Sequence, residues 1–212
     1  MNLIALALAS TLTCQPVLNK ELVGLWESTS ISKGGIGNNI EFRIDGSYVA
    51  AVTVLVDLRY EVKNGKLYTG KNTGEPVSFE AGAEIKVDNN ALILIGQNGE
   101  KEVRNRISPG RANSVVGKYK YRHYTGAIAY EQFTADGLMQ FRLPMQSTRG
   151  CYLVSGNEVK VTSPNQEAKT LQYKLSAGRL VLVDQKNPST YKHVKDGAWY
   201  ESGNIDYKPP DK

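Results

Sequence analysis

The sequence predicts an all-β protein. Twenty glycines and twelve tyrosines occur in 212 residues of which 41 % are apolar, and this composition favours many short strands joined by tight turns. In IKVDNNALILI (85–95), apolar residues alternate with Lys86 and Asp88 before the chain turns at Asn89 and Asn90. That period of two is typical of paired, half-buried strands. No segment has the period of a helix, so we expect antiparallel strands in a barrel or sandwich.

An internal duplication organises these strands. FRIDGSY (42–48) is echoed by FTADGLM (133–139), and each carries the Asp-Gly pair of a β-hairpin. Further segments match in the same order, at offsets from 88 to 93 residues. The matching pairs are LVGLWES (22–28) with VVGKYKY (115–121), YEVKNGKLY (60–68) with YLVSGNEVK (152–160), IKVDNNALILI (85–95) with YKLSAGRLVLV (173–183), and KEVRNRI (101–107) with STYKHVK (189–195). Ordered self-similarity of this kind predicts a module written twice.

The repeats divide the chain into five parts. These are a leader and N-terminal segment (1–20), a first repeat (21–107), a linker SPGRANS (108–114), a second repeat (115–195) and a tail (196–212). The linker contains Pro, Gly and Ser without periodicity. The tail lies outside the repeat, and we expect its aromatic residues Trp199, Tyr200 and Tyr207 to pack against the second barrel before the chain frays at its two prolines.

The first residues predict export. MNLIALALASTLTCQP has a short apolar run followed by small residues, and Ala7-Leu8-Ala9 offers a signal-peptide cleavage site. Alternatively, TLTC resembles a bacterial lipobox, which would place a lipid on Cys14. In the first case Cys14 can form a disulfide with Cys151, and in the second Cys151 is a lone thiol. Signal-peptide cleavage predicts a periplasmic or secreted protein. Lipidation of Cys14 predicts an outer-membrane lipoprotein.

Three of these features resemble the bacterial lipocalin-like domains: Gly24-Leu25-Trp26 at the start of a repeat, the F-x-x-D-G hairpin, and a closing strand with Arg104 and Arg106. The resemblance implies two tandem small antiparallel barrels, one per repeat. One continuous barrel built from both repeats is the alternative. The resemblance also implies that Trp26 closes one end of a barrel, with Arg104 or Arg106 stacked across its indole. The second repeat departs from this pattern, with Tyr119 for the Trp and Lys192 at the position of Arg104.

Charge differs between the repeats. Residues 21–107 carry ten basic and twelve acidic residues, whereas residues 111–195 carry thirteen basic and five acidic. In GKYKYRHY (117–124), strand alternation places Lys118, Lys120 and Arg122 on one face. These three residues are candidates for contact with an anionic surface or macromolecule. The alternative is that they only keep the exterior of a barrel soluble.

Catalytic and metal-binding patterns are missing from the sequence. The two histidines, His123 and His193, have no neighbouring cluster of ligand residues. Cys151 has a conceivable base in His123, but nothing marks this cysteine as activated. The glycine-rich SKGGIGNN (32–39) lacks the Lys-Ser/Thr of a phosphate-binding loop. We therefore expect no cofactor and no metal. Enzymatic activity, which lipocalin-like barrels occasionally have, ranks third behind two binding functions because the sequence shows no catalytic constellation.

Two functions remain. The first is a carrier whose barrel binds a small hydrophobic or amphiphilic molecule against apolar, tyrosine-rich walls. The candidate ligand-binding residues are Phe42, Tyr48, Tyr60, Tyr119, Tyr121, Tyr130, Phe133 and Phe141. The second is an interaction protein with packed barrels, whose basic second repeat docks on an anionic macromolecule or membrane surface. Export disfavours nucleic acid as the partner, and direct membrane attachment is expected only through a lipid on Cys14.

Overall fold

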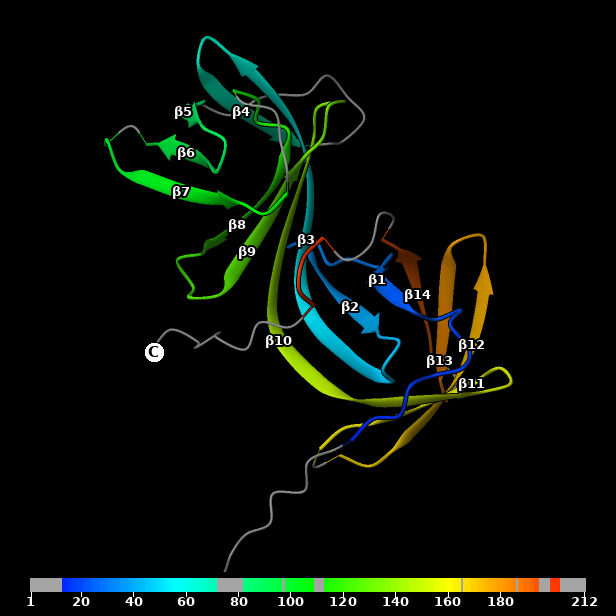
Figure 1. Cartoon of the computed structure of the whole chain (residues 1–212). Helices are drawn as coiled ribbons and strands as arrows, with labels where there is room; N and C mark the ends of the chain where they lie inside the picture. The colour runs from blue at the N-terminus through cyan, green and yellow to red at the C-terminus, as the bar shows by residue number, and fades with distance from the viewer. Residues whose placement is uncertain are drawn as a thin grey trace, which may run out of the picture.

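The computed structural model (Figure 1) describes residues 13–71, 82–96, 98–108, 113–164, 166–185, 187–194 and 199–202. The expected leader and cleavage site, most of the linker and residues 203–212 of the tail lie outside these ranges. The strands are β1 (Gly24–Ser28), β2 (Ile36–Phe42), β3 (Ser47–Lys63), β4 (Lys66–Lys71), β5 (Ala83–Val87), β6 (Ala91–Ile95), β7 (Lys101–Arg106), β8 (Gly117–Arg122), β9 (Ile128–Phe133), β10 (Leu138–Ser155), β11 (Glu158–Thr162), β12 (Lys169–Ser176), β13 (Arg179–Asp184) and β14 (Asn187–His193). The prediction of an all-β protein is confirmed. In the described part of the chain, no helix is long and apolar enough to cross a membrane.

The fourteen strands form one closed antiparallel ring. Each strand pairs with the next along the chain, and β14 pairs with β1, with His193 opposite Trp26. The strand β7, which ends the first repeat, pairs with β8, which begins the second. The ring is therefore built from both repeats.

The long strands β3 and β10 also pair with each other, from Ser47 opposite Cys151 to Arg59 opposite Leu138. This ribbon crosses the ring and divides it into two circuits (Figure 1). The first circuit consists of β1, β2, β11, β12, β13 and β14 with the beginning of β3 and the end of β10. The second circuit consists of β4 to β9 with the end of β3 and the beginning of β10. Each circuit thus takes strands from both repeats, which differs from the expected one barrel per repeat.

The exchange of strands also changes the expected aromatic stacking. Arg106 lies over Tyr119, with its Cζ 4.9 Å from the ring centroid, whereas Trp26 packs edge-on against His193 at 4.7 Å. Arg104 lies over Tyr121 instead. The expectation that Arg104 or Arg106 stacks on Trp26 is therefore wrong, because the last strand of each repeat pairs with the first strand of the other.

The two pairs, Trp26 with His193 and Tyr119 with Arg106, nevertheless occupy equivalent positions in the two repeats. Trp26 donates its indole N–H to the carbonyl of Leu22 at 2.8 Å, and Tyr119 donates its hydroxyl to the carbonyl of Val115 at 3.0 Å. Both bonds reach back four residues along the chain. The duplication is thus visible in the structure, because the first strand of each repeat carries an aromatic side chain with the same hydrogen bond.

The Asp-Gly hairpins occur in both repeats as the sequence predicts. Gly46 and Gly137 have φ of +79° and +81°, a conformation that favours glycine. The Gly46 N–H donates to the carbonyl of Arg43 at 3.0 Å, and the Gly137 N–H donates to that of Thr134 at 3.2 Å. These turns join β2 to β3 and β9 to β10.

Each circuit encloses its own apolar core. The core of the first circuit contains the buried residues Val17, Leu22, Trp26, Phe42, Tyr48, Tyr152, Val159, Tyr173, Leu180, Leu182 and Tyr191. The core of the second contains Leu67, Leu92, Val115, Tyr119, Phe133 and Met139. A shift of register between Pro144 and Ser147 lets β10 turn Met139 toward the second core and Tyr152 toward the first.

The N-terminal segment is fastened across the first circuit. Cys14 forms a disulfide with Cys151, at a sequence separation of 137 residues. The Val17 N–H donates to the carbonyl of Ile44 at 3.1 Å, and the Val17 side chain is buried in the first core. Of the two fates considered for Cys14, the structure has the disulfide.

Candidate functional site

The first circuit contains a cavity of about 220 Å³. Its apolar wall comes from strands β2, β3, β11, β12 and β13, through Ile40, Phe42, Tyr48, Ala50, Val161, Leu171 and Leu182. Thr148, Ser163, Gln166, Glu167 and Lys169 supply polar groups. Because neighbouring strands turn alternate residues inward, an apolar wall and a few polar groups converge on one space.

A second cavity of about 350 Å³ adjoins the first. The two share Ile40, Ala50 and Thr148. The second adds polar groups from Asn38, Asn39 and Gln146 and the ring of Tyr191. Ala50 is a small side chain on the wall common to both, so its size controls the space in each.

The structure distributes the candidate ligand-binding residues over three places. Phe42 and Tyr48 line the cavity of the first circuit, where the Tyr48 hydroxyl and the Ser163 hydroxyl are 2.6 Å apart. The residues Tyr60, Tyr119, Phe133 and Phe141 pack in the core of the second circuit. Tyr121 contacts Arg104, and Tyr130 lies in a cleft outside both cores.

Sequence reasoning missed the aliphatic part of the cavity wall. Ile40, Leu171 and Leu182 each lie on the inward face of an alternating strand, and that alternation was the available signal. The predicted ligand-binding residues are all aromatic, and four of them pack in the core of the second circuit. The cavity instead follows the smaller side chains of the first circuit.

A buried ion pair occupies part of the second circuit. Arg104 and Glu131 form a salt bridge, and both side chains are less than one-tenth exposed. The Tyr121 hydroxyl donates to Glu131 Oε1 at 3.1 Å, and burial raises the pKa of Tyr121. Arg104 also lies over the Tyr121 ring, with its Cζ 4.7 Å from the centroid. This network and the aromatic cluster of the core occupy part of the second circuit. A cavity of about 400 Å³ lies at β4, β5 and β6 of the same circuit.

A second buried ion pair joins strands of the two repeats. Arg142 donates from Nε to Glu27 Oε1 at 2.6 Å and from Nη1 to Asp57 Oδ1 at 2.8 Å. The Tyr200 hydroxyl donates to Glu27 Oε1 at 3.0 Å and accepts from Asn39 Nδ2 at 3.1 Å. Burial raises the pKa of Tyr200 well above its usual value, and the Glu27 carboxylate adds to that effect.

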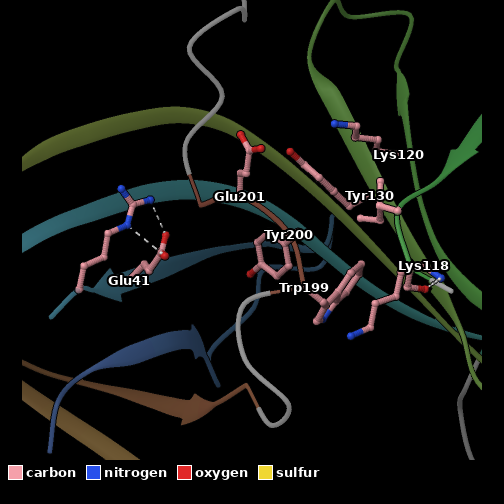
Figure 2. A pocket seen from close by; sticks show the side chains of 10 residues that line it. Glu41, Lys118, Lys120, Tyr130, Trp199, Tyr200 and Glu201 are labelled. Carbon is pink, nitrogen blue, oxygen red and sulfur yellow. Dashed lines mark hydrogen bonds and ion pairs between the residues drawn. The ribbon is translucent and has the colours of Figure 1, made fainter. Parts of the chain in front are cut away.

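A cleft of about 480 Å³ lies beside this network. It is lined by Glu41, Arg43, Ile107, Ser108, Lys118, Lys120, Tyr130, Trp199, Tyr200 and Glu201. Figure 2 shows Trp199 and Tyr200 between Glu41 on one side and Lys118 and Lys120 on the other. Of the three basic candidates, two meet in this cleft, whereas Arg122 donates to the carbonyl of Gly126 at 2.9 Å.

The described part of the tail contacts both circuits. Trp199 and Tyr200 form a buried cluster with Leu25 of β1, Tyr130 of β9 and Val194. The expectation that these aromatics pack is confirmed, but their neighbours include a strand of the first circuit as well as one of the second. The tail therefore helps to fix the relation between the two circuits.

The histidines have local structural contacts. His123 lies 2.9 Å from the Thr125 hydroxyl through Nδ1, and burial lowers its pKa. His193 packs against Trp26. Among the described residues, no group of three His, Cys, Asp or Glu side chains could hold a metal ion.

No protein-family model, curated protein or solved structure matches this chain.

Proposed function

We propose that the protein is an exported, non-catalytic carrier that binds a small amphiphilic molecule inside the first circuit. In this proposal each circuit is a small lipocalin-like barrel, and the first is the binding barrel. The observation that carries the proposal is the cavity lined by strands of both repeats, with an apolar wall and a smaller set of polar groups. Ligand sites in proteins generally combine these two features.

The residues that line the cavity of the first circuit indicate which class of ligand it would bind. Phe42, Leu171 and Leu182 give an apolar body its contact area. Gln166, Glu167 and Lys169 are polar, and Gln166 and Glu167 precede β12 rather than lying within it. This combination suits a molecule with an apolar body and a polar head group. The adjoining cavity, which shares Ile40, Ala50 and Thr148, provides room for a longer body.

The difference between the circuits supports a carrier over a protein with two packed barrels. A packed interior fits the second circuit, where Arg104, Glu131 and Tyr121 lie among aromatic side chains. The second circuit also has a cavity, of about 400 Å³, but Lys66, Glu84 and three glycines make up most of its lining. The cavity of the first circuit instead has a continuous apolar wall. In this proposal the second circuit contributes stability and the first binds the ligand.

The disulfide supports the exported location. Cys14 and Cys151 are the only cysteines of the sequence, and they pair with each other. Disulfides persist mainly in oxidising compartments such as the periplasm or the extracellular space. We therefore propose a periplasmic or secreted location.

The proposal is tested with the neutral fluorescent amphiphile N-phenyl-1-naphthylamine. We expect saturable binding to the full chain and a loss of at least about tenfold in affinity in Ala50→Phe, because the added ring occupies space in both cavities. The matched control is Ala83→Phe in β5, which adds the same ring to the wall of the cavity of about 400 Å³ on the second circuit. This variant should bind the probe like the original protein.

Each result has a defined meaning. Equal binding by Ala50→Phe and the original protein would contradict a site in the first circuit. If Ala50→Phe does not fold, as judged by circular dichroism, Thr148→Phe adds a ring to the same shared wall and replaces it in the test. Native mass spectrometry of protein from its own host then identifies the bound molecule.

A further inference from the structure

The cleft outside the two cores lies where corresponding strands of the repeats approach each other. In the repeat, β1 and β2 of the first circuit correspond to β8 and β9 of the second. Under this correspondence, Lys118 and Lys120 occupy the positions of Leu25 and Glu27. The wall that β1 forms beneath the tail therefore carries an apolar and an acidic side chain, which do not line the cleft themselves. The wall that β8 forms carries two lysines that do line it.

The tail covers the first of these walls. Leu25 is fully buried in the cluster with Trp199 and Tyr200. Glu27 is engaged by Arg142 and by the Tyr200 hydroxyl. The polar groups of this wall thus have partners within the chain.

Glu41 is also engaged. Its carboxylate accepts from Arg43 Nε at 3.1 Å and Nη2 at 2.9 Å, and from the Ser202 hydroxyl at 2.7 Å. The carboxylate of Glu41 is therefore already neutralised by a neighbouring guanidinium. This leaves Glu201, which is exposed to solvent, as the other acidic group of the lining.

The basic wall lacks such partners. In the part of the chain that the structure describes, neither Lys118 nor Lys120 forms an ion pair. Both side chains line the cleft from the same face of β8, where alternate residues are neighbours. Two unpaired ammonium groups on one wall favour a bound anion.

The rest of the lining suits a flat apolar body. Trp199, Tyr130 and Ile107 provide apolar surface, and the volume of about 480 Å³ lies within the range of small-molecule sites. We propose that this cleft binds a small organic anion with a flat apolar body, such as an aromatic carboxylate. Its charged group lies by Lys118 and Lys120, and its ring packs against Trp199 and Tyr130. This site is separate from the cavity of the first circuit.

The two tryptophans of the sequence make the site observable by NMR. The probe is 2-naphthoate, titrated into the full ¹⁵N-labelled chain. We expect a saturable shift of the Trp199 indole N–H signal, assigned with Trp199→Phe. The Trp26 indole N–H is hydrogen-bonded to Leu22 in the first core, and its signal should stay in place.

Two double variants distinguish the effect of Lys118 and Lys120 on binding from the effect of the protein's net charge. Lys118→Gln with Lys120→Gln should weaken the binding of 2-naphthoate by at least about tenfold. The matched control is Lys160→Gln with Lys174→Gln, two exposed lysines on β11 and β12 that change the net charge equally. That control should bind 2-naphthoate like the original protein.

Three results would overturn the proposal. The first is a shift of Trp26 without one of Trp199, which would place the probe in the first circuit. The second is equal binding of the neutral analogue 2-naphthylmethanol, since the lysines would then contribute nothing. The third is binding of heparin through Lys118 and Lys120 without binding of 2-naphthoate, which would make this face a surface for an anionic polymer. Ala50→Phe, designed for the other cavity, should leave the Trp199 titration unchanged.

Discussion

Arg142 is the residue at which strands of both repeats and the tail meet. Its side chain is about 1 % exposed and contacts Glu27 of β1 and Asp57 of β3, while Trp199 lies with its ring centroid 6.0 Å from Cζ. A buried charge is tolerated only when it is paired and hydrogen-bonded. The network therefore fixes the position of the tail together with the pairing of the long strands.

Replacing Arg142 should destabilise the protein strongly. Arg142→Met leaves the Glu27 carboxylate buried without its main partner, and we expect the free energy of unfolding to fall by about 3–5 kcal/mol. The measurement is urea unfolding followed by circular dichroism. Lys192→Gln removes the half-exposed partner of Glu27 and should cost less than about 1 kcal/mol. Similar losses in the two variants would show that Arg142 is not the dominant partner.

Buried tyrosines should make the fold sensitive to alkali. Burial raises the pKa of Tyr130 and that of Tyr152 to about 12, whereas tyrosine in an unfolded chain titrates near about 10. A raised pKa in the folded state stabilises the fold fully below the unfolded pKa, and this contribution is lost as the pH rises toward 12. We expect the urea midpoint to fall steadily between pH 10 and 12.

The measurement combines tyrosinate absorbance at 295 nm with circular dichroism. The buried tyrosines should ionise together with loss of structure. Ionisation of all tyrosines near pH 10 with the fold intact would contradict the burial described above.

At the scale of strands and turns, the sequence predicts the local structure well. The alternation in 85–95 becomes β5 and β6, joined at Asn89 and Asn90 as expected. The Asp-Gly hairpins also form, because their geometry depends on residues adjacent in the chain. Such features need only local information.

Pairing between the ends of the repeats could not be predicted in this way. The first strand of each repeat matches the closing strand of either repeat, because the two copies share one pattern. A Cβ at Gly24 would overlap the His193 ring, and one at Gly117 would lie 2.6 Å from Arg106 Nη1. The resemblance placed Arg104 or Arg106 against Trp26, whereas the partner side chains in the structure are His193 for Trp26 and Arg106 for Tyr119. The strand exchange determines which copy supplies each one.

The N-terminal segment gives the prediction at this scale. Reduction of the Cys14–Cys151 disulfide frees a loop of 137 residues, and native disulfides that close long loops contribute about 2–5 kcal/mol. We expect dithiothreitol to lower the urea midpoint of the original protein. Cys14→Ser with Cys151→Ser should show the lower midpoint with or without dithiothreitol. An unchanged urea midpoint on reduction would mean that the buried Val17 side chain and the Val17 hydrogen bond are enough to keep the N-terminal segment in place.

At the scale of the whole molecule, the shared ribbon makes the two repeats interdependent. The pairs β1–β14, β7–β8 and β3–β10 all join a strand of one repeat to a strand of the other. Neither circuit contains a complete set of strands from a single repeat. The repeats of the sequence and the circuits of the fold are therefore different divisions of the same chain.

Cutting the linker should leave the molecule assembled. We expect cleavage at a protease site inserted into residues 109–112 to give two fragments that co-elute in size-exclusion chromatography, even with the disulfide reduced. The reason is that each circuit needs strands from both fragments. Separation into two folded monomers would contradict the exchanged pairing. The first fragment expressed alone should fail to form a folded monomer.

The position of the ribbon in the chain also sets an order of assembly. Every strand of the second circuit has been synthesised once the first part of β10 is complete, whereas the first circuit needs β14, the last strand of the chain. Pairing between Trp26 and His193 spans nearly the whole sequence, and such distant contacts form slowly. We therefore expect the edge of β1 to be among the last to pair when the chain folds. If the first circuit is the carrier proposed above, an amphiphile present while the chain folds would meet the cavity wall before the cavity has closed.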